Sequence, residues 1–125
     1  MPAFSNTSKN AKNTIVISGY FGFENTGDEA VLAAVVQTIR QDIPEARIVA
    51  LSANPQMTAE HLQIEAVQRD DFRAVWRVLS SARLFISGGG SLFQDITSVS
   101  SVIYYAMLIH MAWLKRVPVM VLAQG

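Results

Sequence analysis

The sequence predicts an α/β fold in which helices cover both faces of a doubly wound, mostly parallel sheet. Short β-branched runs alternate with segments whose apolar residues recur at helical spacing. The first and fourth of these runs lead directly into glycine-rich segments. Half of the 125 residues are hydrophobic and only 16% are charged, so the chain can fill the core of one domain.

The predicted elements alternate along the chain. The strands are apolar runs that end at turn signals: 14–18, 47–51, a weak run at 63–67, 84–87 and 117–122. The helices are about 27–41, a short one at 58–62, one from Asp70 or Asp71 to about 81, and a long one from Thr97 or Ser98 to about 115. Because parallel strands need crossover connections, we expect right-handed βαβ units throughout.

One domain is expected, preceded by a leader. Residues 1–13 are rich in Ser, Asn and Lys and are expected to be disordered, and residues 14–125 are expected to form a Rossmann-like domain. The last strand is followed only by Ala123–Gly125, whereas such a strand normally leads into a covering helix. We therefore expect the domain to be truncated at its C-terminal end.

Composition excludes several classes of function. Ten basic residues balance ten acidic ones, so no net field attracts nucleic acid or an anionic membrane. The absence of cysteine excludes a disulfide scaffold and a thiolate site, and it fits the cytoplasm, where we expect the protein. The apolar stretch 99–114 falls short of the roughly 18–20 residues that span a bilayer. No His/Asp/Glu cluster has metal-ligand spacing, and neither a metal nor a cofactor is predicted.

The first glycine-rich segment, Gly19–Glu29, lies between a strand and a helix, where doubly wound folds bind ligands. Gly22 and Gly27 let a ligand approach the backbone, and they have Walker A spacing. However, Asp28 and Glu29 stand where Lys and Ser/Thr would be required, and two carboxylates would repel a triphosphate. The dinucleotide pattern G-x-G-x-x-G is absent too, so we exclude NAD binding.

A structural interpretation competes with ligand binding in this segment. Thr26 and Glu29 form T-x-x-E, a capping box, and this role is favoured for Glu29. Asp28 either complements the helix dipole or faces a ligand. Asn25 is either a turn residue or a ligand contact.

The second glycine-rich segment, Ser87–Asp95, contains Gly88, Gly89 and Gly90 in succession. Three glycines carry a high entropic cost that a plain turn rarely needs, so the close approach of a ligand or of another backbone is favoured. Gln94 and Asp95 offer an amide and a carboxylate to a ligand, or else they cap the next helix.

The two segments are expected to meet. In a sheet ordered 3-2-1-4-5 the first and fourth strands are neighbours, and ligands bind outside their carboxyl ends. We therefore expect one crevice, with Ala123–Gly125 beside it. Elsewhere, His110 is predicted to be a core or interface residue, His61 to be solvated, and Tyr104 and Tyr105 to be packing residues.

Three motifs resemble those of the polysaccharide pyruvyl transferase family, and most closely its cell-wall polymer branch. They are G-Y-F-G-F-E-N-T-G-D-E-A-V-L (19–32), I-S-G-G-G-S-L-F-Q-D (86–95) and V-M-V-L-A-Q-G (119–125). The resemblance implies transfer of the enolpyruvyl unit of phosphoenolpyruvate to a sugar, giving a cyclic ketal and phosphate. It also implies a GT-B-like enzyme of two Rossmann-like domains, of which this would be the N-terminal, acceptor-side half. The family's catalytic histidine and basic residues belong to the other domain, so no catalytic residue is assigned here.

The chemistry of the segments agrees with this division. Phosphoenolpyruvate needs a clamp of Arg, Lys or His, which neither segment supplies, whereas Asn25, Gln94 and Asp95 suit sugar hydroxyls. The implied ligands are phosphoenolpyruvate and a sugar or lipid-linked saccharide, and a homo-oligomer is compatible with the sequence. Two alternatives stay open: a GT-B glycosyltransferase that uses a nucleotide sugar, and a non-catalytic Rossmann-like binding module.

Overall fold

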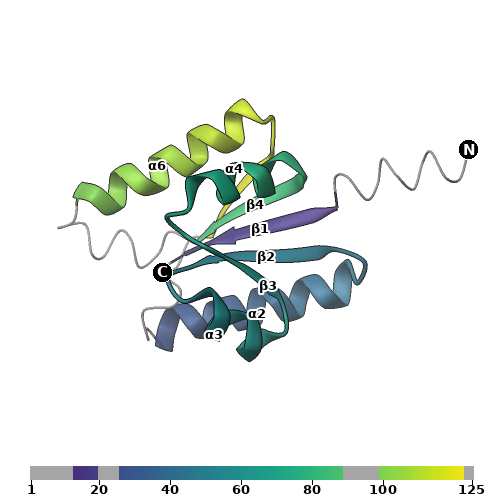
Figure 1. Cartoon of the computed structure of the whole chain (residues 1–125). Coiled ribbons are helices and arrows are strands. Elements are labelled where there is room, and N and C mark those ends of the chain that lie inside the picture. The colour runs from purple at the N-terminus through teal and green to yellow at the C-terminus, as the bar shows by residue number, and fades with distance from the viewer. Residues whose placement is uncertain (1–12, 20–25, 89–98, 123–125) are drawn as a thin grey trace, which may run out of the picture.

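A computed structural model of the chain describes residues 13–19, 26–88 and 99–122. They form a five-stranded, all-parallel sheet in the order β3-β2-β1-β4-β5, which confirms the predicted doubly wound topology (Figure 1). The strands are β1 (Thr14–Ser18), β2 (Arg47–Ser52), β3 (Glu65–Gln68), β4 (Ala82–Gly88) and β5 (Val119–Leu122). The predicted disordered leader falls largely outside the described residues, and so do Thr97 and Ser98, the predicted caps of the long helix.

The helices form two layers, one on each face of the sheet (Figure 1). They are α2 (Thr26–Asp42), α3 (Pro55–Leu62), α4 (Phe72–Ser80) and α6 (Val99–Leu114). Helices α2 and α3 cover one face, and α4 and α6 cover the other. Each face therefore receives the crossover connections that parallel strands require.

Two boundaries differ from prediction because of local backbone chemistry. Helix α3 begins earlier than residue 58, since the Asn54 side chain accepts a hydrogen bond from the Met57 N–H and Pro55 occupies the first turn. Gln63 ends α3 in the left-handed region with φ 57°, so β3 starts later than the predicted residue 63. Asp71 caps α4 as predicted.

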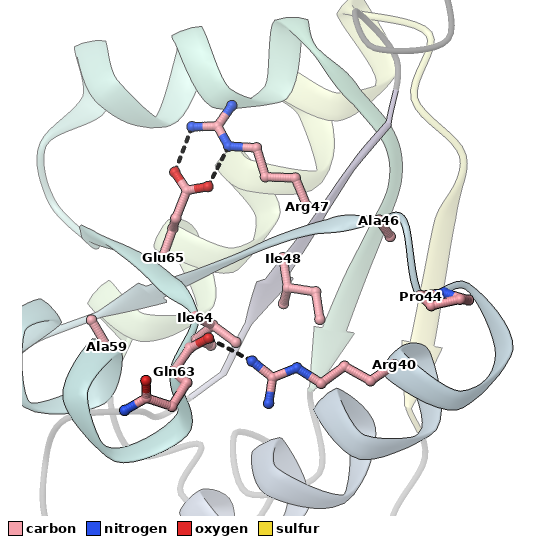
Figure 2. A pocket seen from close by; sticks show the side chains of 9 residues that line it. All are labelled: Arg40, Pro44, Ala46, Arg47, Ile48, Ala59, Gln63, Ile64 and Glu65. Carbon is pink, nitrogen blue, oxygen red and sulfur yellow. Dashed lines mark hydrogen bonds and ion pairs between the residues drawn. The ribbon is translucent and has the colours of Figure 1, made fainter.

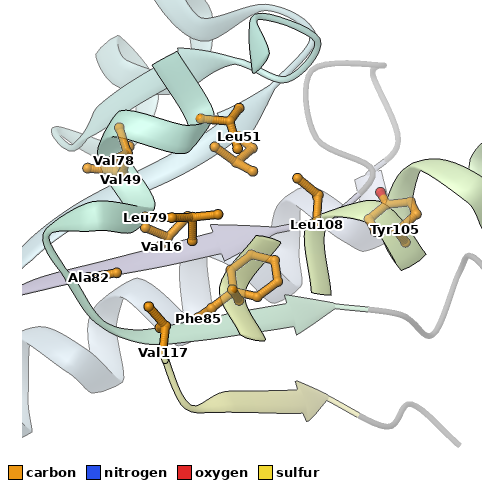
Figure 3. Packing of buried hydrophobic residues seen from close by; sticks show 12 residues of the cluster. Val16, Val49, Leu51, Val78, Leu79, Ala82, Phe85, Tyr105, Leu108 and Val117 are labelled. Atoms are coloured by element: carbon orange, nitrogen blue, oxygen red, sulfur yellow. The ribbon is translucent and has the colours of Figure 1, made fainter. Parts of the chain in front are cut away.

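The sheet is buried between two apolar clusters. On the α4/α6 side, Val16 and Phe85 are fully buried against residues such as Leu79 and Leu108 (Figure 3). On the α2/α3 side, Ile15 and Ile17 of β1 pack with Leu32, Val36 and Ile39 of α2. Alternate residues of β1 thus face opposite layers, which is why its sequence is apolar throughout.

The last strand is exposed for most of its length, although its apolar sequence is typical of a buried strand. Val117 is buried, but Val119, Met120 and Val121 are 36%, 48% and 55% exposed. The reason is position, since β5 is an edge strand that pairs with β4 alone among the described strands. Within the described ranges, no helix combines the length and the apolar character needed to cross a membrane.

Candidate functional site

The carboxyl ends of β1 and β4 lie side by side. Ser18 of β1 pairs in register with Ser87 of β4, and Gly88 pairs with Leu122 of β5. Both glycine-rich segments therefore leave the sheet from neighbouring strands at one edge, where the strand order reverses. This confirms the strand arrangement on which the predicted crevice depends.

The predicted site residues are only partly within the described residues. Gly22, Asn25, Gly89, Gly90, Gln94 and Asp95 lie outside them. Gly27 and Asp28 lie in the first turn of α2, which begins at Thr26, where the sequence predicts a cap. Gly88 is the last residue of β4. The ligand contacts assigned to all nine residues, and the capping box itself, stay predictions.

A repeated tripeptide marks both strand ends. Ile-Ser-Gly occurs at Ile17–Gly19 and again at Ile86–Gly88, and the Ile and Ser residues of the two copies pair in register. Strand alternation places Ser18 on the same face as Val16, and Ser87 on the same face as Phe85, which is the α4/α6 face. Both serines are buried, at 1% and 4% exposure.

The Ser18 hydroxyl is unusual because its oxygen is buried and makes no hydrogen bond among the described residues. Leaving a buried polar group unpaired costs about 1–3 kcal/mol, so such groups are rare in native folds. Sequence reasoning overlooked Ser18, although the repeated Ile-Ser-Gly was a signal that could have revealed it.

The end of β2 shows the opposite arrangement. The Ser52 oxygen lies 2.8 Å from the hydroxyl of buried Thr58 and accepts a hydrogen bond from the Asn54 N–H at 2.9 Å. Asn54 in turn caps α3. This serine is therefore fully engaged in joining β2 to α3, and its role is structural.

The end of β3 brings an arginine onto aromatic side chains of α6. The Arg69 guanidinium carbon lies 4.3 Å from the ring centroid of Tyr104 and 5.6 Å from that of Tyr105. Tyr104 donates its hydroxyl hydrogen to the Arg69 carbonyl. Burial raises the pKa of Tyr104, although the neighbouring Arg69 opposes that shift. Both tyrosines pack as predicted. Sequence reasoning did not single out Arg69, although its position directly after a strand was a signal that could have revealed it.

A cleft of about 440 Å³ lies at the other edge of the sheet, where β2 and β3 begin (Figure 2). There Arg47 donates two hydrogen bonds of 2.6 Å to the carboxylate of Glu65, and this pairing lowers the pKa of Glu65. Arg40 donates to the Gln63 carbonyl at 2.5 Å. Because these charged groups bind one another and the backbone, we interpret the cleft as a structural feature. It lies at the opposite edge of the sheet from the carboxyl ends of β1 and β4.

The histidines do not contribute to the carboxyl edge. His110 is exposed on α6 and stacks on Trp113 with 5.9 Å between ring centroids, so a core position is excluded. His61 is exposed in the last turn of α3, as predicted. No three His, Cys, Asp or Glu side chains of the described ranges could jointly hold a metal ion.

Comparison with protein families identifies a match over most of the chain. Residues 25–125 match the family described as polysaccharide pyruvyl transferase, a range that starts in the first glycine-rich segment and includes the second. Comparison with curated proteins and with solved structures gives no match.

Proposed function

The chain belongs to the polysaccharide pyruvyl transferase family, and we propose that it forms the acceptor side of an enzyme that pyruvylates a cell-wall or exopolysaccharide sugar. The donor would be phosphoenolpyruvate, and the acceptor a sugar or lipid-linked saccharide. One observation carries the proposal. The carboxyl ends of β1 and β4 are adjacent at the point where the strand order reverses, and a segment that resembles a family motif follows each strand.

The reaction sets the demands on the site. Two hydroxyl oxygens of one sugar form bonds to carbon 2 of the enolpyruvyl unit, while the bond from that carbon to the phosphate oxygen breaks. One hydroxyl proton ends on the methylene carbon, which becomes a methyl group, and the other leaves with phosphate. The enzyme must therefore hold two sugar hydroxyls in a fixed geometry toward one carbon.

The proposed contact residues fit this demand. Asn25, Asp28, Gln94 and Asp95 offer amides and carboxylates that orient hydroxyl groups. Gly22, Gly27 and Gly88–Gly90 would let the sugar approach the backbone closely. We propose that most of the charge of the donor is met by residues of a second domain, as the family resemblance implies.

Titration of the ¹⁵N-labelled chain with the methyl glycoside of N-acetylmannosamine tests the acceptor site. We expect the glycine amides of the two segments to shift, and Asp28→Asn to weaken binding several-fold at an unchanged melting temperature, because a carboxylate accepts the stronger hydrogen bond. Glu29→Gln is the matched control, since Gln also serves in a capping box. Unchanged affinity with a lowered melting temperature would make Asp28 purely structural.

A second measurement addresses the donor. The chain is incubated with phosphoenolpyruvate and the same glycoside, and free phosphate is assayed. We expect none from this chain by itself, so phosphate release would contradict the assignment of the donor clamp to a second domain. Saturable binding of a nucleotide sugar in place of the glycoside would favour the glycosyltransferase alternative.

A further inference from the structure

The layer formed by α4 and α6 carries the exposed apolar side chains of the described helices. Large apolar residues are exposed on α4 and α6, but not on the described parts of α2 and α3. Trp113 of α6 is the most exposed of them, at 70%. Because α4 and α6 cover the same face of the sheet (Figure 1), these side chains share one outer surface. We call it the α4/α6 surface, and its apolar members are Phe72, Trp76, Ile103, Ile109, Trp113 and Leu114.

Helix α6 has the composition of a helix that is covered on all sides. No charged side chain occurs between Val99 and Leu114. Leu108 is buried against the sheet, whereas Ile109 and Trp113 are exposed on the outside. A helix that is apolar all round is normally buried in a larger apolar environment. The outer side of α6 therefore has the character of a contact surface.

Charge is distributed unevenly between the two helix layers, although it is balanced over the whole sequence. The acidic residues of α2 and α3, which outnumber the single arginine there, are Asp28, Glu29, Asp42 and Glu60. Helices α4 and α6 and the turn after α6 contain basic residues and no acidic one: Arg73, Arg77, Lys115 and Arg116. Asp70 and Asp71 precede α4, and Asp71 caps it. The α4/α6 surface is therefore basic as well as apolar.

Contacts between α4 and α6 make this surface continuous. The Lys115 ammonium lies 4.1 Å from the ring centroid of Trp76, and the ring centroids of Phe72 and Tyr104 are 6.1 Å apart. On α4 an arginine directly follows each aromatic residue. Long basic side chains can lie along apolar surface while their charge stays at a polar boundary. Tryptophan has a similar dual character, which suits it to the boundary between water and hydrocarbon.

An anionic lipid surface matches both properties, and other occupants match only one. The headgroups of an anionic bilayer attract basic residues, and the layer beneath them accepts tryptophan and aliphatic side chains. A second copy of the chain would bring two basic surfaces together through α6, while its acidic α2/α3 layer exposes no large apolar side chain among the described residues. Nucleic acid is negative too, but protein–DNA interfaces are more polar than the outer side of α6.

We propose that the α4/α6 surface binds an anionic lipid bilayer, with Trp113 in the headgroup region and Arg73 and Arg77 close to the lipid phosphates. This is peripheral binding, in which apolar side chains enter only the outer part of the bilayer. The inference goes beyond the proposed function and does not depend on it. If both hold, the domain works at the surface where a lipid-linked acceptor would lie.

Co-sedimentation of the 125-residue chain with vesicles tests the proposal. The vesicles consist of phosphatidylcholine alone or of equal parts of phosphatidylcholine and phosphatidylglycerol. We expect binding to the mixed vesicles that weakens as salt is added, and much weaker binding to the neutral ones. Equal binding to both kinds of vesicle, or binding to neither, would overturn the proposal.

Arginine variants locate the contact on the molecule. Arg77→Gln should weaken binding to the mixed vesicles about fivefold, and its combination with Arg73→Gln about thirtyfold, since each basic residue near an anionic surface contributes about a fivefold factor. Arg40→Gln is the matched control, because it removes the same charge from an exposed site on α2 and should leave binding unchanged. Equal losses in Arg77→Gln and Arg40→Gln would show that net charge alone is sensed, and the proposal would fail.

Trp113 reports on the apolar part of the contact. Trp113→Ala should weaken binding about tenfold at an unchanged melting temperature, whereas Trp113→Phe should retain most of the affinity. Trp76→Phe leaves Trp113 as the only tryptophan, whose fluorescence should shift to the blue when mixed vesicles are added. An unshifted emission in a chain that sediments with the vesicles would place the contact elsewhere and overturn the proposal.

The other occupants have their own signatures. Analytical ultracentrifugation would reveal a dimer that Trp113→Ala dissociates if a second copy covers this surface, and tighter binding to duplex DNA than to mixed vesicles would favour nucleic acid. Either result would overturn the proposal. The glycoside titration is performed without vesicles, so a chain that binds the glycoside but no vesicle would refute this inference and leave the proposed function intact.

Discussion

Polar groups are paired differently at the two edges of the sheet. At the amino edge, polar groups bind one another: Arg47 pairs with Glu65, and the Asn13 side chain donates to the Glu45 carbonyl at 2.5 Å. At the carboxyl edge, Ser52 of β2 is paired in the same way, but β1 ends in a buried hydroxyl that pairs with none of the described residues. Both edges border the same two apolar clusters, so burial of the sheet does not explain the contrast.

The contrast indicates where stability and recognition reside. A polar group that is already paired within the fold adds to stability and has little left for a ligand. A buried hydroxyl without a partner at a strand end, and the glycines that follow it, both lower the stability of the fold. Folding alone does not require either feature. We therefore expect the amino edge and the end of β2 to govern stability, and the ends of β1 and β4 to govern binding.

Ser52→Ala should have the largest effect on stability among the changes considered at the two edges. It leaves the buried Thr58 hydroxyl and the Asn54 N–H without their partner, at a cost of about 1–3 kcal/mol in the free energy of unfolding. Urea denaturation measures this loss. Ser80→Ala, which removes an exposed hydroxyl from α4, is the control and should stay within about 0.5 kcal/mol. Equal losses in the two variants would show that pairing at the end of β2 is unimportant.

Glu65→Gln should have a smaller effect, which depends on pH. The Arg47 and Glu65 side chains are 51% and 54% exposed, so solvent screening limits the pair to about 1 kcal/mol or less. Because Arg47 lowers the folded-state pKa of Glu65, the stabilisation is complete above the unfolded-state pKa and is lost as pH falls through the folded-state pKa. Melting curves of both proteins should therefore converge in acid and in high salt. A difference that persists unchanged in acid would contradict an ionic origin.

Ser18→Ala should have the smallest effect on stability and gives the sharpest test of the contrast. Removing a buried hydroxyl that has no partner among the described residues should leave the free energy of unfolding unchanged or slightly raised. Ser52→Ala is the matched comparison, since both serines end a strand and both are buried. If the two substitutions cost the same in urea denaturation, Ser18 has a structural partner and the distinction between the strand ends is lost.

The sequence was sufficient to predict the strand order and most of the elements. Apolar runs and helical periodicity located β1, α2 and β4 closely, because their burial dictates their residue types. The boundary between α3 and β3 was harder, since it depends on Gln63 adopting a positive φ, which its residue type does not demand.

The sequence predicted only those parts of the candidate site that are visible as local motifs. Glycine-rich segments after β1 and β4 are visible as motifs, and the sheet topology brings their strand ends together. Arg69 was missed because it contacts Tyr104, which lies in α6 and is distant from the end of β3 in the sequence. The sequence left His110 between a core and an interface position for a similar reason, since a neighbouring layer, and not residue type, decides burial.

The position of β1 in the sheet bears on the order in which the protein can assemble as it is made. β1 is synthesised before the other described strands, yet it is central, and its partner β4 begins only at Ala82. At the usual 5–20 residues per second, about 3 to 13 s separate the synthesis of the two strands. During that interval β2 can already pair with β1, and α2 can cover one of its faces. Val16 and Ser18, on the other face, are not yet covered by α6. The carboxyl end of β1 thus gains β4 as its neighbour only when the ribosome has delivered the second half of the chain.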